Sequence, residues 1–461
     1  MAITATYIVP HPPLLISEIG RGQEKKIQNT IDSYKKVAQD IAEQKPETIV
    51  IITPHSIMYE DYIHISPGRE AFGNLKKFGE YKLSFHVEYD NRLVNKIEEL
   101  AGQKGIPAGT LGERDKAVDH GSLVPIYFID QYYQNYKVVR ISVSGLTYLE
   151  HYRFGKCLQE AVKALNRNVV IVASGDLSHR LKEEGAYSFA EEGPIFDAQV
   201  TDAMAKADFI SFLKFDEGFC EAAGECGLRS FIIMAGALDG KAVEPEFLSY
   251  EAPFGVGYAV CKYLVSGDAD DRNFDELYKK EQKKCMEKIK MDEDDYVKLA
   301  RLSLETYIKE RKNLKRPNQL PKELIDQKAG VFVSLKKYGR LRGCIGTISP
   351  VEDSVADEII QNAVSAGVGD PRFQPITEDE LPDIVYSVDV LEKPEPIQSI
   401  SQLDPKQYGV IVSKGRKRGL LLPNLEGVTT PEQQISIALK KAGISEDETF
   451  NLERFKVVRH K

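Results

Sequence analysis

The chain has 461 residues, of which 42% are apolar and 28% charged, and its formal net charge is −9. This length exceeds one ordinary domain, so two or three domains are expected. The acidic balance argues against nucleic acid as a main partner, because phosphate binding needs a clustered cationic surface. No apolar run approaches the roughly 20 residues of a membrane span, so no membrane association is expected.

The cysteine pattern and the N-terminus bear on the compartment. No two of the six cysteines form a CxxC pair, so neither a zinc knuckle nor a thioredoxin-type site is indicated. Scattered free thiols, and an N-terminus without the pattern of a secretory signal, predict a cytoplasmic protein.

The first part of the chain alternates between strand-like and helical runs. Strands are predicted at ITATYIVP, TIVIITP, YKVVRISVSG and NVVIVASGD, and helices at 23–44 and 148–166. This alternation predicts an α/β domain, at 1–265, with a mainly parallel central sheet. In such sheets ligand sites gather beyond the carboxyl ends of the strands.

A change of composition follows. Residues 266–290 are rich in charge and poor in apolar residues, which is typical of a linker, part of it helical. Beyond it we expect an α+β domain at 291–461. Its predicted elements are helices at 294–312, 351–366 and 431–442, strands at 330–337, 341–348 and 384–391, a hairpin at 410–423 and a last strand at 454–458.

Four of the eight histidines occur in distinctive settings at predicted strand ends or loops. They are His11 in PHPP, His55 in TPHS, His120 in VDHGSLVP and His179 in SGDLSHR. Two have an aspartate nearby, Asp119 and Asp176, and a carboxylate that accepts from one ring nitrogen fixes the tautomer and raises the basicity of the other. A structural role at a strand end is the alternative for each histidine alone.

Together these histidines and the acidic turn AAGECGLRS suggest metal chemistry. Two histidines and one carboxylate on one face are the usual ligands of non-haem Fe(II), and they leave positions open for a bidentate substrate and dioxygen. Two further histidines near the open face could move protons, because imidazole titrates near neutral pH.

The first 265 residues resemble the LigB-type, class III extradiol ring-cleavage dioxygenases and their relatives, the Memo family. VPHPPLL, ITPHS, VDHGSLVP, SGDLSHR and AAGECGLRSFIIMAGAL carry the resemblance, in that order. It implies that His11, His55 and Glu225 bind iron and that His120 and His179 act as the acid/base pair. Cys226 occupies a position where Memo-type proteins present a cysteine, so a His/His/Cys site that favours copper or zinc stays open, as does a buried structural role for this thiol.

The last 170 residues resemble the AMMECR family, through LRGCIGT at 341–347 and VGDPRFQPI at 368–376. The residues themselves suggest a cleft with an anion pocket and a nucleophilic thiol, formed by Arg342, Gly343, Cys344 and Arg372. The alternative is structural: the glycines serve strand curvature and the cysteine fills space.

The combination of both domains resembles the fusion proteins of the AmmeMemoRadiSam system. That resemblance implies a radical SAM protein and a Memo-type protein as partners, and the related dioxygenases often form homo-oligomers. Two alternative functions therefore remain open. One is an Fe(II)-dependent dioxygenase acting on a catechol-like or other bidentate aromatic; the other is a metal-binding module without ring-cleavage activity that serves a radical SAM modification pathway.

Overall fold

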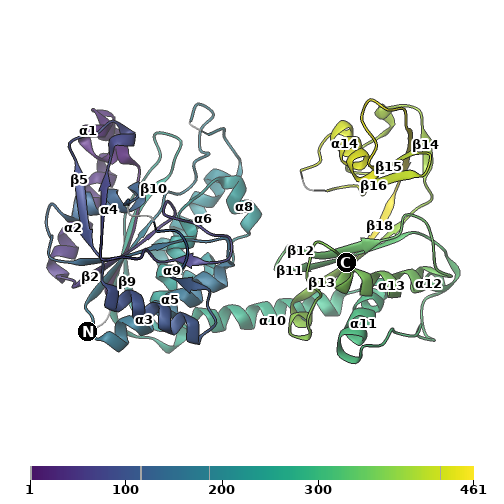
Figure 1. Ribbon diagram of the computed structural model, residues 1–461, viewed down its shortest axis with the longest axis horizontal. Helices are drawn as coiled ribbons and strands as arrows, with labels where there is room; N and C mark the ends of the chain where they lie inside the picture. Colours follow the sequence, from purple (N-terminus) through teal and green to yellow (C-terminus); the bar gives the residue numbers. More distant parts are fainter. Residues whose placement is uncertain (1–2, 115–116, 186, 426) are drawn as a thin grey trace. The chain divides into compact units, whose positions relative to one another are not determined.

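A computed structural model describes residues 3–114, 117–185, 187–425 and 427–461 (Figure 1). The chain forms two compact units, Met1–Lys280 and Glu281–Lys461. The division falls inside the predicted linker and within a charged helix, α10 (Phe274–Asp292), and the last strand of the first unit extends to Asp268, past the predicted domain end at 265. No helix in the described ranges is long and apolar enough to cross a bilayer.

The first unit is built on a six-stranded sheet in the order β7-β2-β8-β1-β10-β9. Strands β7, β2, β8 and β1 are mutually parallel, and β10 runs antiparallel to β1 and β9. The strands are β1 (Ile3–Val9), β2 (Thr48–Thr53), β7 (Lys137–Ser142), β8 (Val169–Ser174), β9 (Lys241–Glu251) and β10 (Tyr258–Asp268), with two small pairs, β3 (Ile63–His64) with β6 (Ala108–Gly109) and β4 (Glu70–Asn74) with β5 (Ser84–Glu88). The predicted α/β class with a mainly parallel sheet is confirmed.

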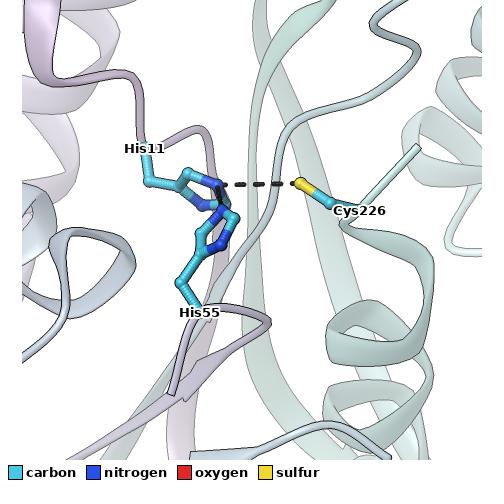
Figure 2. Close-up of side chains that lie close together, drawn as sticks. All are labelled: His11, His55 and Cys226. Atoms are coloured by element: carbon cyan, nitrogen blue, oxygen red, sulfur yellow. Dashed lines mark hydrogen bonds between the residues drawn. The ribbon is translucent and has the colours of Figure 1, made fainter. Parts of the chain in front are cut away.

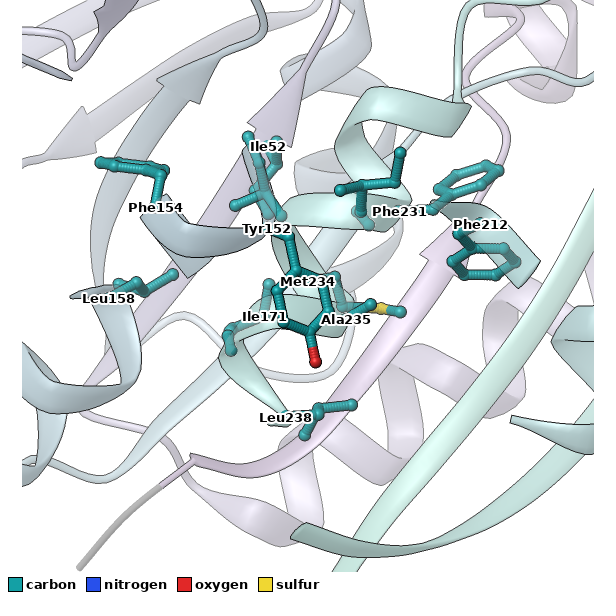
Figure 3. Packing of buried hydrophobic residues seen from close by; sticks show 14 of the residues in the cluster. Ile52, Tyr152, Phe154, Leu158, Ile171, Phe212, Phe231, Met234, Ala235 and Leu238 are labelled. Carbon is teal, nitrogen blue, oxygen red and sulfur yellow. The ribbon is translucent and has the colours of Figure 1, made fainter. Parts of the chain in front are cut away.

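Helices cover both faces of this sheet, which explains why its central strands are apolar throughout. Alternate residues of β2 and β8 belong to two separate apolar clusters, one on each face (Figure 3 shows the first). The helices are α1 (Ser17–Gly20), α2 (Gln28–Gln44), α3 (Asn91–Gln103), α4 (His120–Ile129), α5 (Tyr148–Leu165), α6 (Glu192–Lys206), α7 (Phe209–Phe212), α8 (Glu217–Ala223) and α9 (Leu228–Ala237). The helix predicted at 23–44 begins instead with a 3-10 turn, Gln23–Ile27.

Helices α5 and α9 cross in close contact because each presents a glycine to the other. A Cβ atom added at Gly155 would lie 2.1 Å from the carbonyl oxygen of Ile233, and one at Gly236 would lie 2.0 Å from that of Tyr152. This contact fixes α9, and therefore the turn that precedes it, against the sheet.

The second unit has helices and two four-stranded antiparallel sheets, which confirms the α+β class. One sheet has the order β12-β11-β13-β18 and the other β14-β17-β15-β16. The elements are α11 (Asp295–Glu310), α12 (Lys322–Asp326), β11 (Val331–Lys337), β12 (Arg340–Gly346), α13 (Val355–Val368), β13 (Ile384–Leu391), β14 (Glu395–Ile397), β15 (Gly409–Lys414), β16 (Lys417–Leu421), α14 (Pro431–Ala442), β17 (Asn451–Phe455) and β18 (Val457–His460).

Two predicted elements of this unit differ from the structure. Helix α13 begins at Val355 rather than 351, because the Ser354 side chain accepts from the Asp357 N–H and so starts the helix there. The single last strand at 454–458 is two strands, β17 and β18, which leave Lys456 between them and join different sheets.

Candidate functional site

Three metal-ligating side chains meet beyond the carboxyl ends of the parallel strands. His11 follows β1, His55 follows β2, and Cys226 lies in the turn before α9. The two strands flank β8 in the sheet, so their ends lie close together although the residues are far apart in the sequence. Figure 2 shows the two imidazoles pointing toward each other and the thiol approaching from the opposite side.

The distances between these atoms suit one ion. The Nε2 atoms of His11 and His55 are 2.8 Å apart, and the Cys226 Sγ is 3.6 Å from His11 Nε2. All three ligand atoms lie within 4.8 Å of one another, and among the described residues this is the one such group of potential metal ligands. His11 is buried while His55 is exposed, so the group opens to solvent on the His55 side.

Ser174 at the end of β8 fixes the tautomer of His11. Its hydroxyl donates to the Gly121 carbonyl at 2.6 Å, so the hydroxyl oxygen is left to accept the Nδ1–H of His11 at 3.0 Å. The Nε2 atom of His11 then carries a lone pair directed at the group, which is the form that binds a metal.

Both imidazoles are held neutral at physiological pH. Burial, followed by the nearby histidines His55, His120 and His179, lowers the pKa of His11 well below its usual value. Desolvation, and then His120, lowers the pKa of His55 to about 4. Burial raises the pKa of the Cys226 thiol, so this group keeps its proton until a cation replaces it.

Glu225, the predicted third ligand, is not a member of this group of three. Its carboxylate accepts from the Leu228 N–H at 2.7 Å and so satisfies the first turn of α9. Burial raises its pKa to about 7. The geometry favours Cys226, which the sequence offered as the alternative to Glu225, as the third metal ligand.

His120 and His179 lie beside the group, as expected of an acid/base pair. The His120 ring, at the start of α4, stacks on His55 with a centroid distance of 4.1 Å. His179 Nδ1 is 2.5 Å from the Gly224 carbonyl oxygen, which can only accept, so the proton is on Nδ1 and Nε2 is free to take another. Burial lowers the pKa of both rings.

The two aspartates do not orient the histidines next to them in sequence. Asp119 caps α4 through the Ser122 N–H and pairs with the buried Arg140 at 3.3 Å. Asp176 accepts from the backbone N–H of His11 at 2.8 Å, and burial raises its pKa to about 7. Both therefore brace the backbone of the site rather than a ring nitrogen of His120 or His179.

Asp197 on α6 supports the segment that carries His179. Its carboxylate accepts from the backbone N–H of Ser178 at 2.8 Å and from the Tyr250 hydroxyl at 2.7 Å. The residue is 2% exposed, and burial raises its pKa from 3.8 to about 6.

Replacing Asp197 by asparagine should remove a pH-dependent cost of folding. The folded state holds this proton more tightly than the unfolded state, so the wild type loses stability as pH rises from about 4 to about 6, and the loss is complete above that range. The difference in unfolding free energy between Asp197→Asn and wild type should therefore be larger at pH 8 than at pH 4.5, by about 2 kcal/mol. Urea unfolding at the two pH values measures it; a difference that does not change with pH would contradict the prediction.

The second predicted site is assembled in part. Arg372 Nη2 donates to the Cys344 carbonyl at 3.2 Å, and the Cys344 N–H donates to Asp370, the partner of Arg372. Arg342 instead pairs with Glu380 at 2.9 Å. Gly343 faces α13, where an added Cβ would lie 2.1 Å from the Ala366 carbonyl oxygen.

Sequence reasoning missed several residues of both sites. Ser174 and Gly175 lie at the end of the predicted strand NVVIVASGD, directly before Asp176. A serine at the end of a buried strand is the feature of the sequence that could have indicated a role for Ser174. Asp370, the ion-pair partner of Arg372 at the second site, lies in the motif VGDPRFQPI but was not predicted as a site residue.

Comparison with known proteins gives two family matches. Residues 5–261 match the model of the catalytic LigB subunit of aromatic ring-opening dioxygenase, and residues 297–460 match AMMECR1. A protein of Clostridium acetobutylicum is 46% identical over 469 aligned positions, which cover all of both chains. A Thermotoga maritima protein is 51% identical over 171 residues, 37% of this chain and 98% of that one. The crystal structure of an uncharacterized Pyrococcus horikoshii protein has a TM-score of 0.34 and 33% identity, over 36% of this chain and 88% of that one.

Proposed function

Because the chain belongs, over residues 5–261, to the family of the catalytic LigB subunit of aromatic ring-opening dioxygenase, we propose that its first unit is a non-haem Fe(II)-dependent enzyme of the extradiol dioxygenase type. The substrate would be a catechol-like or other bidentate aromatic. One observation carries this proposal: His11, His55 and Cys226 present three donor atoms within 4.8 Å, and His120 and His179 adjoin them.

The residues present fit a divalent ion. The lone pair of His11 Nε2 is fixed by Ser174, both imidazoles are neutral, and the exposed side at His55 leaves room for further ligands. When bound, the ion would supply Lewis acidity toward the two substrate oxygens and electron exchange with dioxygen.

The protein's own contribution is proton transfer and orientation. A neutral His179, with Nδ1–H donated to Gly224, offers Nε2 as the base for a substrate hydroxyl. Once protonated, His179 can return this proton to the product, and His120, stacked on His55, is a second neutral imidazole able to accept a proton. Tyr187, whose ring lies 5.4 Å from that of His179, stands beside this pair.

Oxygen uptake by the Fe(II)-loaded full chain, with a panel of catechols, tests the proposal. We expect uptake that depends on both iron and a catechol. The His179→Ala variant should retain its iron and lose turnover by about 100-fold or more. Iron-loaded protein that consumes no oxygen with any catechol would contradict dioxygenase activity.

The thiol donor favours a second candidate, a metal-binding module without ring cleavage. Sulfur ligands favour Cu(I) and Zn(II) over hard ions. In this alternative, the first unit would work with a radical SAM protein and a Memo-type protein in a modification pathway, together with the AMMECR1-matching unit. Tight binding of Cu(I) or Zn(II), without oxygen uptake, is the result expected for this candidate in the same experiment.

A further inference from the structure

Two exposed aromatic side chains contact the acid/base histidines of the first unit. The Phe78 ring lies edge-on to that of His120, with a centroid distance of 5.3 Å and an interplanar angle of 60°. The Tyr187 ring lies edge-on to that of His179, at 5.4 Å and 74°. Phe78 is 38% exposed and Tyr187 is 55% exposed, so each ring leaves aromatic surface available to a ligand.

Phe78 lies on the side at which the metal group opens to solvent. His55 is the exposed member of that group, His120 stacks on it, and Phe78 contacts the same His120 ring. Phe78 ends a 3-10 turn, Lys76–Phe78, which directly follows the fully buried Leu75. The Phe78 N–H donates to the Leu75 carbonyl at 2.9 Å. The backbone that presents this ring is therefore fixed to the core, although the ring itself is exposed.

Tyr187 lies on the side of the thiol. Its neighbour His179 is held by the Gly224 carbonyl oxygen, two residues before the cysteine of the metal group. Arg180 donates from Nε to the Ser188 carbonyl at 3.0 Å and from Nη2 to the Ser188 hydroxyl at 3.2 Å. These bonds join the residue after His179 to the residue after Tyr187, and so they keep the two rings together.

The two aromatic rings therefore flank the metal group from two separate loops. A substrate that fills the open positions of the ion must also lie within reach of His179 and His120, if these are to exchange protons with it. Such a substrate would meet Phe78 on one flank and Tyr187 on the other. Edge-to-face and offset-stacked ring pairs are favourable beyond the apolar area that they bury, so this setting suits a flat aromatic ring.

We propose that Phe78 and Tyr187 hold the ring of the substrate at the metal group, so that the site prefers aromatic chelators to aliphatic ones. This role rests on the aromatic substrate proposed above for the first unit. It makes the two residues determinants of binding and specificity, while proton transfer stays with the histidines.

Titration of 4-nitrocatechol into the Fe(II)-loaded full chain, without air, tests the proposal. Chelation deprotonates this probe and changes its visible absorbance, so the affinity is measured without turnover. We expect Phe78→Leu and Tyr187→Leu each to weaken binding by about threefold to tenfold, because leucine is apolar but has no aromatic ring. Tyr187→Phe keeps the ring and should recover most of the affinity that Tyr187→Leu loses. Iron content should be the same in all of these variants.

Phe72→Leu is the matched control. Phe72 is 61% exposed and stacks on His86 at a centroid distance of 4.7 Å, which is the same kind of contact made away from the metal group. This variant should bind 4-nitrocatechol as tightly as the wild type.

Acetohydroxamate, a bidentate chelator without a ring, controls for access to the ion itself. Its affinity is measured by its displacement of 4-nitrocatechol, and it should not change in Phe78→Leu or Tyr187→Leu. A variant that misfolds would instead lose iron and both chelators together. The ratio of the two affinities therefore isolates the contact with the ring.

The outcomes separate this role from dioxygenase activity. Leucine variants with an unchanged ratio of the two affinities would overturn the proposal for Phe78 and Tyr187, even where catechols drive oxygen uptake. A selective loss of 4-nitrocatechol affinity, without oxygen uptake by any catechol, would support the aromatic site and contradict the dioxygenase. Iron-loaded wild-type protein that does not bind 4-nitrocatechol would contradict both.

Discussion

Replacing His55 by alanine is expected to remove nearly all bound metal from the protein. Three side chains form the candidate group, and the loss of one leaves the ion with two protein donors and a wider opening to solvent. We expect the affinity to fall by about 100-fold or more, since even residues that only support ligands cost 10- to 100-fold. Metal content, measured by mass spectrometry on protein purified without air, gives the result directly.

Three further variants test whether metal is lost only when one of the assigned ligands is replaced. His86 is exposed and pairs with Glu70 away from the group, so His86→Ala should keep its metal. Cys226→Ser should lose affinity, whereas Glu225→Gln should retain it, because that side chain holds the start of α9 instead. Metal that survives in His55→Ala, or that is lost only in Glu225→Gln, would show that the ligands have been assigned wrongly.

A second large effect, on both metal affinity and stability, is expected from replacing Gly175, a residue that has no side chain to bind a metal. Gly175 lies between Ser174 and Asp176, and a Cβ atom there would lie 2.2 Å from the Cα of Gly227, the neighbour of Cys226. In Gly175→Ala the end of β8 and the start of α9 must therefore separate, which moves the thiol away from His11. We expect metal affinity to fall by at least about tenfold, and the unfolding free energy by about 2–3 kcal/mol.

Gly102 provides the matched glycine-to-alanine control. It lies in α3, and nothing comes within 4 Å of an added Cβ atom. Gly102→Ala should stabilise the helix by about 0.5–1 kcal/mol and leave metal binding unchanged. Chelator competition and thermal unfolding of both variants measure the two effects. If Gly175→Ala binds metal as tightly as Gly102→Ala, the two chain segments are not held as described.

Much of the fold was predictable because it depends on local patterns. The apolar runs that became β2 and β8 are buried on both faces, and such runs are typical of the centre of a parallel sheet. The helix predicted at 431–442 coincides with α14, where Thr430 caps the start and Gly443 follows the end. The positions of His11 and His55 followed from the strand ends, since the parallel strands of one sheet finish at the same edge.

The choice between Glu225 and Cys226 could not be made in the same way. The two are adjacent in a turn, and their directions depend on how α9 packs against α5 and β8, which is set by glycine contacts far away in the sequence. The carboxylates Asp119 and Asp176 show the same limit. Each is next to a histidine in sequence or nearly so, yet Asp119 accepts from the distant Thr53 hydroxyl and Asp176 from the distant His11 N–H, which only the folded chain brings near.

The order of the ligands along the chain has a consequence for biosynthesis. Residues 11 and 55 emerge from the ribosome early, while residue 226 emerges only when most of the first unit has been made. A nascent chain therefore displays two imidazoles without their sulfur partner. Strand β8, which lies between β1 and β2 in the sheet, is also made after both of them. The complete set of three ligands therefore exists only after residue 226 has been made and the sheet has formed. We accordingly expect metal binding to follow the folding of the first unit rather than to initiate it.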